Sequence, residues 1–363
     1  MEKDDFLYQT VYDELRSQIR QGDFPPGSLL PPPEKLTERF GVSRITVTRA
    51  LRLLAEEGLI RRVQGKGSVV EKPAVRQISR KKTGAIGVII EHMSSPFGLD
   101  MMYQLDLCAQ ELGYYTLVRF SYGSIEKEAA EIEYLMSLGI EGLVIMPCHG
   151  LYYNQQILKL YLEGFPVVIV DKTMQGIHLP SVRTDNVSAV RILVRKLAEE
   201  GCCRIAYISS EETNVTSVRE RRKGFIEGID SCAAAEAGIL LLPLKSTRED
   251  FLSNTAQGER TQQKIREFLL SAEGRIDGVI CGEYSLLLPL LRAIGSLPGQ
   301  NDLRIATIDS DPLAPGGYPY MHMKQDERAI ARKAVELLRE QLKGRSASAA
   351  DHLIPAIFVP ADE

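Results

Sequence analysis

Residues 40–59 read FGVSRITVTRALRLLAEEGL, and this stretch decides the fold of the N-terminal part of the chain. Its apolar residues recur at helical spacing after Val42 and give a helix one stripe that can pack inward: Val47, Leu51 and Leu54. Ser43 can cap this helix, which leaves Arg44 and Thr46 free to project from its first turns. The second helix of a helix-turn-helix is presented to the DNA major groove in this way. The stretch therefore predicts a DNA-reading helix, with an ordinary solvated surface helix as the alternative.

The residues that follow this helix predict a β-hairpin. Residues 59–63 and 68–70 favour strands, and Gln64-Gly65-Lys66-Gly67 supplies a turn whose glycines can adopt positive φ. A hairpin beside a recognition helix is a wing, and its Gln64 and Lys66 would reach a phosphate or the adjacent minor groove. Helix and hairpin together predict a winged helix-turn-helix of the α+β class.

Residues 7–70 resemble the winged-helix module of GntR-type transcriptional regulators. The resemblance is carried by Tyr8-Gln9, Pro26-Gly27, Leu30-Pro31, Phe40-Gly41-Val42-Ser43-Arg44, Thr46-Val47, Ala50-Leu51, Glu57-Gly58-Leu59 and Gly65-Lys66-Gly67. It implies that DNA is bound through Lys35, Ser43, Arg44, Thr46, Thr48, Arg49, Gln64, Gly65, Lys66 and Gly67. Two departures bear on the operator sequence. Pro32-Pro33-Glu34 stands where Ser-Glu-Arg is usual, and Thr48 replaces a common arginine.

The net charge of −4 hides an uneven distribution over the 363 residues. Residues 1–83 hold 16 Lys and Arg against 11 Asp and Glu, whereas the remainder holds 28 against 37. Phosphates repel an acidic body, so the basic N-terminal part is the part expected to face DNA.

Several classes of protein find no support in the sequence. The chain opens with Met1-Glu2-Lys3, without a signal sequence, and no apolar run approaches the roughly 18 residues that span a membrane, so a cytoplasmic location is expected. The six cysteines lack a C-x-x-C spacing, which favours small buried hydrophobes over a redox pair. The five histidines are scattered, so we expect no metal site, and we expect no cofactor.

Residues 73–83 read as a basic linker between residues 1–72 and a second domain at residues 84–363. In this domain short apolar strands alternate with helical stretches, which predicts α/β parallel sheets with helices on both faces. The expected strands are residues 85–90, 115–120, 142–146, 166–170, 204–208, 239–242, 277–281, 303–308, 321–324 and 353–359. Because the alternation restarts near residue 187, we predict two lobes, crossed by the chain more than once, with a ligand between them.

Polar side chains follow several of these strands. Ser95 and Phe97 come after the first strand, Asp171-Lys172 after residues 166–170, Glu283 after residues 277–281, and Asp309 after residues 303–308. Arg221 is expected on a helix just after the loop that contains Thr216-Ser217. Ligands of open parallel sheets bind at the carboxyl ends of strands. Carboxylates and a guanidinium can hydrogen-bond several hydroxyls, and an aromatic ring can stack on a sugar. The alternative is that the acidic residues merely cap the next helices.

From residue 84 onward the chain resembles the effector domain of LacI/GalR-type repressors and the ribose-type periplasmic sugar-binding proteins. The resemblance is carried by Gly87-Val88-Ile89, Pro96-Phe97, Gly142-Leu143, Val170-Asp171-Lys172, Thr184-Asp185-Asn186, Arg221-x-x-Gly224-Phe225, Asp277-Gly278-Val279, Asp309 and Gln325-Asp326. It implies sugar contacts from Ser95, Phe97, Asp171, Lys172, Arg221, Glu283, Asp309 and Gln325. Lys172 stands where arginine is common, and a lysine makes point-charge contacts that cannot copy an arginine's fork. The two halves together are similar to the family of bacterial arabinose repressors.

These features predict a ligand-responsive transcriptional repressor that binds operator DNA as a homodimer, with a monosaccharide as the leading effector. Two half-sites about one helical turn apart let two winged helices add their binding energies. The alternatives are a sugar-processing α/β enzyme or a plain sugar-binding protein. No G-x-G-x-x-G follows the first strand and no G-x-S-x-G is present, so no catalytic residue is expected.

Overall fold

The computed structural model describes most of the chain. The described ranges are 2–21, 23–56, 59–63, 67–70, 83–148, 154–174, 176–212, 215–232, 235–243, 256–271, 276–297, 303–311, 319–345 and 350–362. The chain divides into two compact units, residues 1–80 and 81–363. Nearly all of the expected linker lies outside the described ranges, so its bounds stay a prediction. Within these ranges, none of the helices combines the length and the apolar character needed to cross a membrane.

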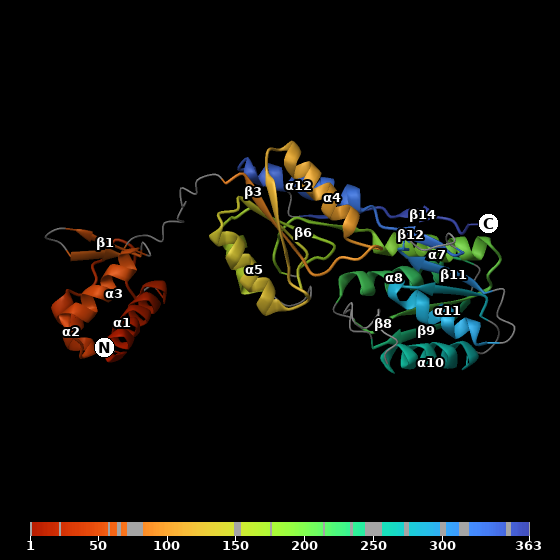
Figure 1. The fold of residues 1–363 in the computed structure, drawn as a ribbon, viewed down its shortest axis with the longest axis horizontal. Coiled ribbons are helices and arrows are strands. Elements are labelled where there is room, and N and C mark those ends of the chain that lie inside the picture. The colour runs from red at the N-terminus through yellow and green to blue at the C-terminus, as the bar shows by residue number, and fades with distance from the viewer. Residues whose placement is uncertain are drawn as a thin grey trace. The chain divides into compact units, whose positions relative to one another are not determined.

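The first unit is a winged helix-turn-helix, as the sequence predicts (Figure 1). It consists of α1 (Glu2–Gln21), α2 (Pro33–Phe40), α3 (Arg44–Glu56) and the antiparallel hairpin of β1 (Ile60–Val63) and β2 (Gly67–Val70). Gly41 ends α2 in the left-handed conformation (φ 63°), which glycine adopts without a steric cost and which makes the turn tight. The apolar stripe of α3 lies in the core as expected, because Val47, Leu51 and Leu54 are fully buried.

The second unit contains two lobes, each built on a six-stranded sheet. The sheet of the first lobe is parallel throughout, in the order β13-β7-β6-β5-β3-β4. Its strands are β3 (Ala85–Ile90), β4 (Tyr115–Phe120), β5 (Gly142–Ile145), β6 (Val167–Val170), β7 (Ser181–Thr184) and β13 (Asp351–Ile354). Its helices are α4 (Leu99–Glu111), α5 (Ile125–Ser137), α6 (Gln155–Leu162) and α12 (Glu327–Leu342).

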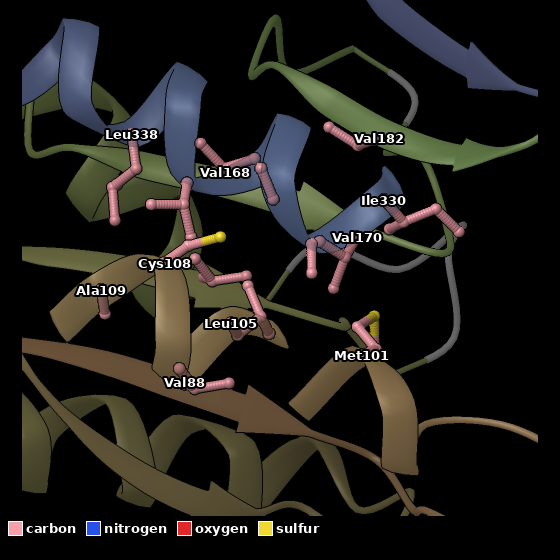
Figure 2. Packing of buried hydrophobic residues seen from close by; sticks show 14 of the residues in the cluster. Val88, Met101, Leu105, Cys108, Ala109, Val168, Val170, Val182, Ile330 and Leu338 are labelled. Atoms are coloured by element: carbon pink, nitrogen blue, oxygen red, sulfur yellow. The ribbon is translucent and has the colours of Figure 1, made fainter. Parts of the chain in front are cut away.

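Alternate residues of these strands face two separate cores, which explains why the strands read as continuous apolar runs. One face is covered by α5 and α6. The other is covered by α4 and α12, and Figure 2 shows Leu105 of α4 and Ile330 of α12 among the buried side chains over Val168 and Val170 of β6. Helix α12 belongs to this lobe although it comes late in the chain.

The second lobe repeats the arrangement, with strand order β14-β12-β11-β10-β8-β9 and only β14 antiparallel to its neighbour. Its strands are β8 (Arg204–Ser210), β9 (Ala235–Leu242), β10 (Gly278–Cys281), β11 (Arg304–Ile308), β12 (Met321–Lys324) and β14 (Ile357–Val359). Helices α7 (Asn186–Glu199) and α8 (Thr216–Asp230) cover one face, and α10 (Ala256–Ser271) and α11 (Leu287–Gly295) cover the other. The two-lobed α/β prediction is confirmed.

Within the described ranges the chain passes between the lobes at three places: from β7 to α7, from β12 to α12, and from β13 to β14. The crossings are bonded to one another. The hydroxyl of Thr184 donates to Oε1 of Gln325 (2.6 Å), and the amide of Asp185 donates to the carbonyl of Ile354 (2.8 Å). Strand β7 was not predicted from the sequence. The single strand expected at residues 353–359 was wrong, because this stretch contributes to two strands, β13 and β14, in different sheets.

Candidate functional site

The first turn of α3 is fixed by its cap. The Oγ atom of Ser43 accepts a hydrogen bond from the amide of Thr46 (3.2 Å), which confirms the predicted cap. The two hydroxyls are also bonded to each other at 2.8 Å, and Thr46 is only 5% exposed. The expectation that Thr46 projects from the helix is therefore wrong, because the cap and the core hold its side chain.

The exposed face of α3 carries Arg44, Ile45, Thr48 and Arg49. The guanidinium of Arg44 lies 3.1 Å from a carboxylate oxygen of Glu34 on α2, and both side chains are well exposed. The guanidinium of Arg49 stacks 3.9 Å from the ring centroid of Tyr8. The sequence did not reveal the exposure of Ile45 or the pairing of Arg44 with Glu34.

The remaining predicted DNA contacts lie on α2 and on the wing. Lys35 is exposed on α2. Arg62 of β1 donates to the carbonyl of Thr48 (3.2 Å), which ties the wing to α3. Gly67 begins β2 with a φ of 103°. Gln64, Gly65 and Lys66 lie outside the described residues, so their contribution stays a prediction.

In the second unit Arg221 is the centre of a buried polar cluster. Its Nε donates to Oδ1 of Asn186 on α7 (2.8 Å), and a terminal nitrogen donates to the carbonyl of Gly282 (3.0 Å). Arg221 reaches these partners because α8 packs closely on α7 at Gly224, where an added Cβ would stand 2.4 Å from the carbonyl oxygen of Val187. Asn186 is a site residue that the sequence did not single out, although it stands in the motif Thr184-Asp185-Asn186.

Glu283 lies two residues after the end of β10, and its carboxylate is close enough to Arg221 to feel the charge of the guanidinium. Its carboxylate accepts hydrogen bonds from the hydroxyl of Ser209 (3.0 Å) and from the amide of Ser210 (3.3 Å). Burial raises the pKa of Glu283, and the positive charge of Arg221 opposes that shift. The arrangement gives one arginine two acidic neighbours, Glu283 and Asp309.

Asp171 and Asp309 occupy equivalent places in the two lobes. Both adopt the left-handed conformation (φ 65° and 63°) directly after β6 and β11. Each donates its amide to the next strand in the sheet, Asp171 to Val182 (2.9 Å) and Asp309 to Met323 (2.8 Å). Aspartate tolerates this backbone better than most residues. The carboxylate of Asp309 also accepts from the side-chain amide of Gln325 (2.7 Å), so the second crossing is part of the site.

Lys172 is the cation of the first lobe, but its charge is already neutralised. Its Nζ pairs with the carboxylate of Glu91 and donates to the carbonyl of Pro147 (3.0 Å). Burial acts to lower the pKa of Lys172, but the carboxylates of Glu91 and Asp171 outweigh it and the pKa is raised. Lys172 is thus a charged lysine with an internal partner.

Ser95 and Phe97 lie in the loop between β3 and α4, and the end of this loop is hydrogen-bonded to Glu327. Phe97 is partly buried against the core under α4, and Ser95 is half-buried. The carboxylate of Glu327, at the start of α12, accepts from the amides of Gly98 (2.8 Å) and Met101 (2.9 Å), which fixes the end of the loop. Among the described residues we find no hydrogen bond or ion pair from the side chain of Ser95 to the Arg221 cluster.

The site therefore offers many acceptors and few uncommitted cations. Among the described residues, the predicted effector contacts and their charged neighbours comprise five acidic side chains and two basic ones: Asp171, Glu283, Asp309, Glu327 and Glu91, against Lys172 and Arg221. Such a surface suits a molecule that donates hydrogen bonds and carries no negative charge. In the described ranges no group of three or more His, Cys, Asp and Glu side chains could hold a metal ion.

The cysteines are free, and most are buried as expected. Cys203 is exposed, which contradicts the expectation for that residue. Burial raises the pKa of Cys148 to about 12, so its thiol stays protonated at neutral pH.

The buried carboxyls predict a dependence of stability on pH. Burial raises the pKa of Asp309 to about 6 and that of Glu327 to about 7, against ordinary values of 3.8 and 4.5. Between the ordinary and raised values the folded state binds more protons than the unfolded chain, so raising the pH destabilises the fold. We expect each of these two groups to remove about 3 kcal/mol of stability, about 6 kcal/mol together, as the pH rises through this range.

Urea unfolding, followed by circular dichroism at several pH values from 4 to 8, measures this effect. Glu327→Gln keeps an acceptor for Gly98 but cannot ionise, so it should flatten the dependence. Glu336→Gln on the exposed side of the same helix is the matched control and should leave it unchanged. If the free energy of unfolding depended on pH equally in the wild type and in Glu327→Gln, the raised pKa would not belong to Glu327.

Two family models match the chain. "Bacterial regulatory proteins, gntR family" matches residues 7–70, and "Periplasmic binding proteins and sugar binding domain of LacI family" matches residues 83–282. The chain is 24% identical to the arabinose metabolism transcriptional repressor of Geobacillus stearothermophilus over 353 residues, covering 93% of this chain and 92% of the relative.

Two solved structures share the fold of the second unit. One is the Cra transcriptional dual regulator from Pseudomonas putida in complex with fructose 1-phosphate (TM-score 0.63, 19% identity, 77% of this chain and 100% of that one). The other is a periplasmic binding protein/LacI transcriptional regulator from Alkaliphilus metalliredigens complexed with D-xylulofuranose (TM-score 0.62, 18% identity, 77% and 98%).

Proposed function

This chain belongs to the family of periplasmic binding proteins and LacI-type sugar-binding domains and carries a gntR-type regulatory domain, and from this we propose that it is a transcriptional repressor of carbohydrate-utilisation genes. A small sugar bound between the two lobes controls its affinity for operator DNA. The proposal rests on the presence in one chain of a winged helix, whose α3 has an exposed face, and a two-lobed unit with a buried polar cluster around Arg221. The enzyme alternative finds no support in the relative named above, which is a repressor.

We propose a neutral monosaccharide as the effector, with a pentose leading. Lys172 is paired with Glu91, and Arg221 already faces Glu283 and Asp309. A phosphorylated or acidic sugar would have to compete with these carboxylates for the two cations, whereas hydroxyl groups can donate to them. The name of the Geobacillus stearothermophilus relative also favours a pentose-linked role.

The proposed mechanism is a population shift of the two lobes. A sugar that touches both lobes favours their closed arrangement, and the three bonded crossings carry that change to the whole unit. Effector and operator must then oppose each other by the same factor, because coupling between binding sites is reciprocal. We expect the sugar to release DNA, with the protein acting as a homodimer in the cytoplasm.

The experiment starts from the full-length protein and duplexes of random sequence, from which in vitro selection isolates the preferred site. A thermal-shift screen of neutral, acidic and phosphorylated sugars identifies the effector, since a ligand at 100 times its Kd adds about 2.7 kcal/mol to the folded state. The screening hit is then titrated into the protein–operator complex. Release of DNA supports the proposal. No selected sequence, or an operator affinity that saturating effector leaves unchanged, contradicts it.

The role of Arg44 gives a second check on the DNA-binding part. Arg44→Ala should weaken operator binding by about 5- to 150-fold, because a bidentate arginine–guanine contact is worth about 1–3 kcal/mol. Glu34→Gln should instead strengthen binding severalfold, since the carboxylate that holds Arg44 also repels phosphates. Fluorescence anisotropy with the selected duplex measures both. Unchanged affinity in Arg44→Ala would show that α3 is not the reading helix.

A further inference from the structure

Ile45 stands out on the surface of the first unit. Its side chain is 81% exposed, more than any other large hydrophobic side chain that the described residues expose. It lies in the first turn of α3, next to Arg44 and one turn before Thr48 and Arg49, all of which are exposed. The following residues turn inward, since Thr46 is 5% exposed and Val47 is fully buried.

The fold gives no reason for an isoleucine at this position. The core of the unit takes Val47, Ala50, Leu51 and Leu54 of α3, and Ala55 packs against it. Of the two apolar residues of α3 outside this core, Leu53 is partly buried and Ile45 is exposed. Isoleucine has a lower helix propensity than Ala, Arg or Lys, and its exposure leaves apolar area in water. The side chain therefore gains contacts only when something docks on this face of α3.

The chemistry of the major groove supplies such a partner. A recognition helix meets base edges with its N-terminal residues, and the apolar group that a base presents there is the C5-methyl of thymine. A branched aliphatic side chain has no donor or acceptor and can read only this group. We infer that Ile45 determines operator specificity by packing against a thymine methyl, beside the polar contacts of Arg44.

This inference rests on the proposed function, and its test separates the two. Each thymine of the selected operator is replaced in turn by deoxyuridine, which removes the methyl and nothing else. Affinities are measured by fluorescence anisotropy for the full-length wild type, Ile45→Ala and Ile45→Val. Comparing the base change in the wild type and in the variants isolates the contact between residue 45 and one thymine. Only at a thymine that touches Ile45 should removal of the methyl cease to matter once the side chain is shortened.

At one thymine in each half-site, deoxyuridine should weaken the wild type by about fourfold, the contribution of one buried methyl-sized group. The same duplex should bind Ile45→Ala no more weakly than the thymine duplex does, and Ile45→Val should keep most of the wild-type response. Because Ile45 is exposed, thermal unfolding followed by circular dichroism should be the same for all three proteins.

Operator binding in which no thymine is coupled to residue 45 overturns the inference and leaves the proposed function standing. The inference is also overturned when Ile45→Ala loses DNA affinity at every duplex equally, because the side chain then acts without reading a methyl. If the wild-type protein selects no preferred sequence from the random duplexes, both the inference on Ile45 and the proposed function are overturned.

Discussion

Arg221→Ala should abolish effector binding and lower the free energy of unfolding of the second unit by about 3–5 kcal/mol. The guanidinium donates to Asn186 and to the carbonyl of Gly282, and its charge opposes the raised pKa values of Glu283 and Asp309. Alanine would leave both carboxylates buried without a cation. Chemical unfolding followed by circular dichroism and calorimetric titration with the effector from the sugar screen measure the two losses.

Two controls make this result specific. Lys223→Ala removes an exposed cation from the same helix, and exposed pairs contribute at most about 1 kcal/mol, so stability should barely change. The loss in Arg221→Ala should also be smaller at pH 5 than at pH 8, because protonation of Asp309 removes an uncompensated charge. A stability deficit that is equal at the two pH values would mean that lost packing, not charge, explains it.

Gly224→Ala should destabilise the same unit by about 1–3 kcal/mol, which is the usual cost of forcing extra atoms into a packed contact. The new Cβ would stand 2.4 Å from the carbonyl oxygen and 3.0 Å from the Cα of Val187, so the backbone of α7 itself is in the way. Helix α8 must then move away from α7, and the effector affinity should fall because Arg221 lies one turn earlier on α8. Thermal unfolding and effector titration test both effects.

Gly295→Ala is the matched control, because Gly295 ends α11 and an added Cβ there would meet nothing within 4 Å. Alanine has the better helix propensity, so this variant should be as stable as the wild type or more stable, by up to about 1 kcal/mol. If the two variants behaved alike, the close approach of α7 and α8 would not explain the sensitivity of Gly224.

The periodicity of apolar residues predicted most of the elements, and the failures have physical causes. Residues 85–90 form an apolar run of strand length, and β3 has those bounds. Strand β7 was not predicted because its sequence, SVRT, is short and contains the charged Arg183. In the fold this charge is paired with two residues distant in sequence, Glu220 (2.5 Å) and Asp351 (3.1 Å). Residues 353–359 read as one strand in the sequence. The break between them becomes visible only in the fold, where β13 belongs to the sheet of the first lobe and β14 to the sheet of the second.

The candidate site was predictable at the level of residues near strand ends, but not at the level of their pairing. Placement after β11 identified Asp309, and the family motif identified Arg221. No local pattern could show that Lys172 is paired with Glu91, because these residues are 81 positions apart. The sequence also did not show that Ile45 is exposed. The apolar stripe of α3 begins at Val47, two residues later, and Ile45 lies outside it.

The position of α12 affects how this protein is made. Neither lobe is a continuous piece of chain, since α12 and β13 of the first lobe follow almost all of the second. As the protein is synthesised, the apolar side of α4 stays uncovered by α12 until residues 186–324 have been made, which takes roughly 7–30 s at about 5–20 residues per second. The second lobe lacks only the edge strand β14 by then, so the lobe that begins later should be the first to complete its core.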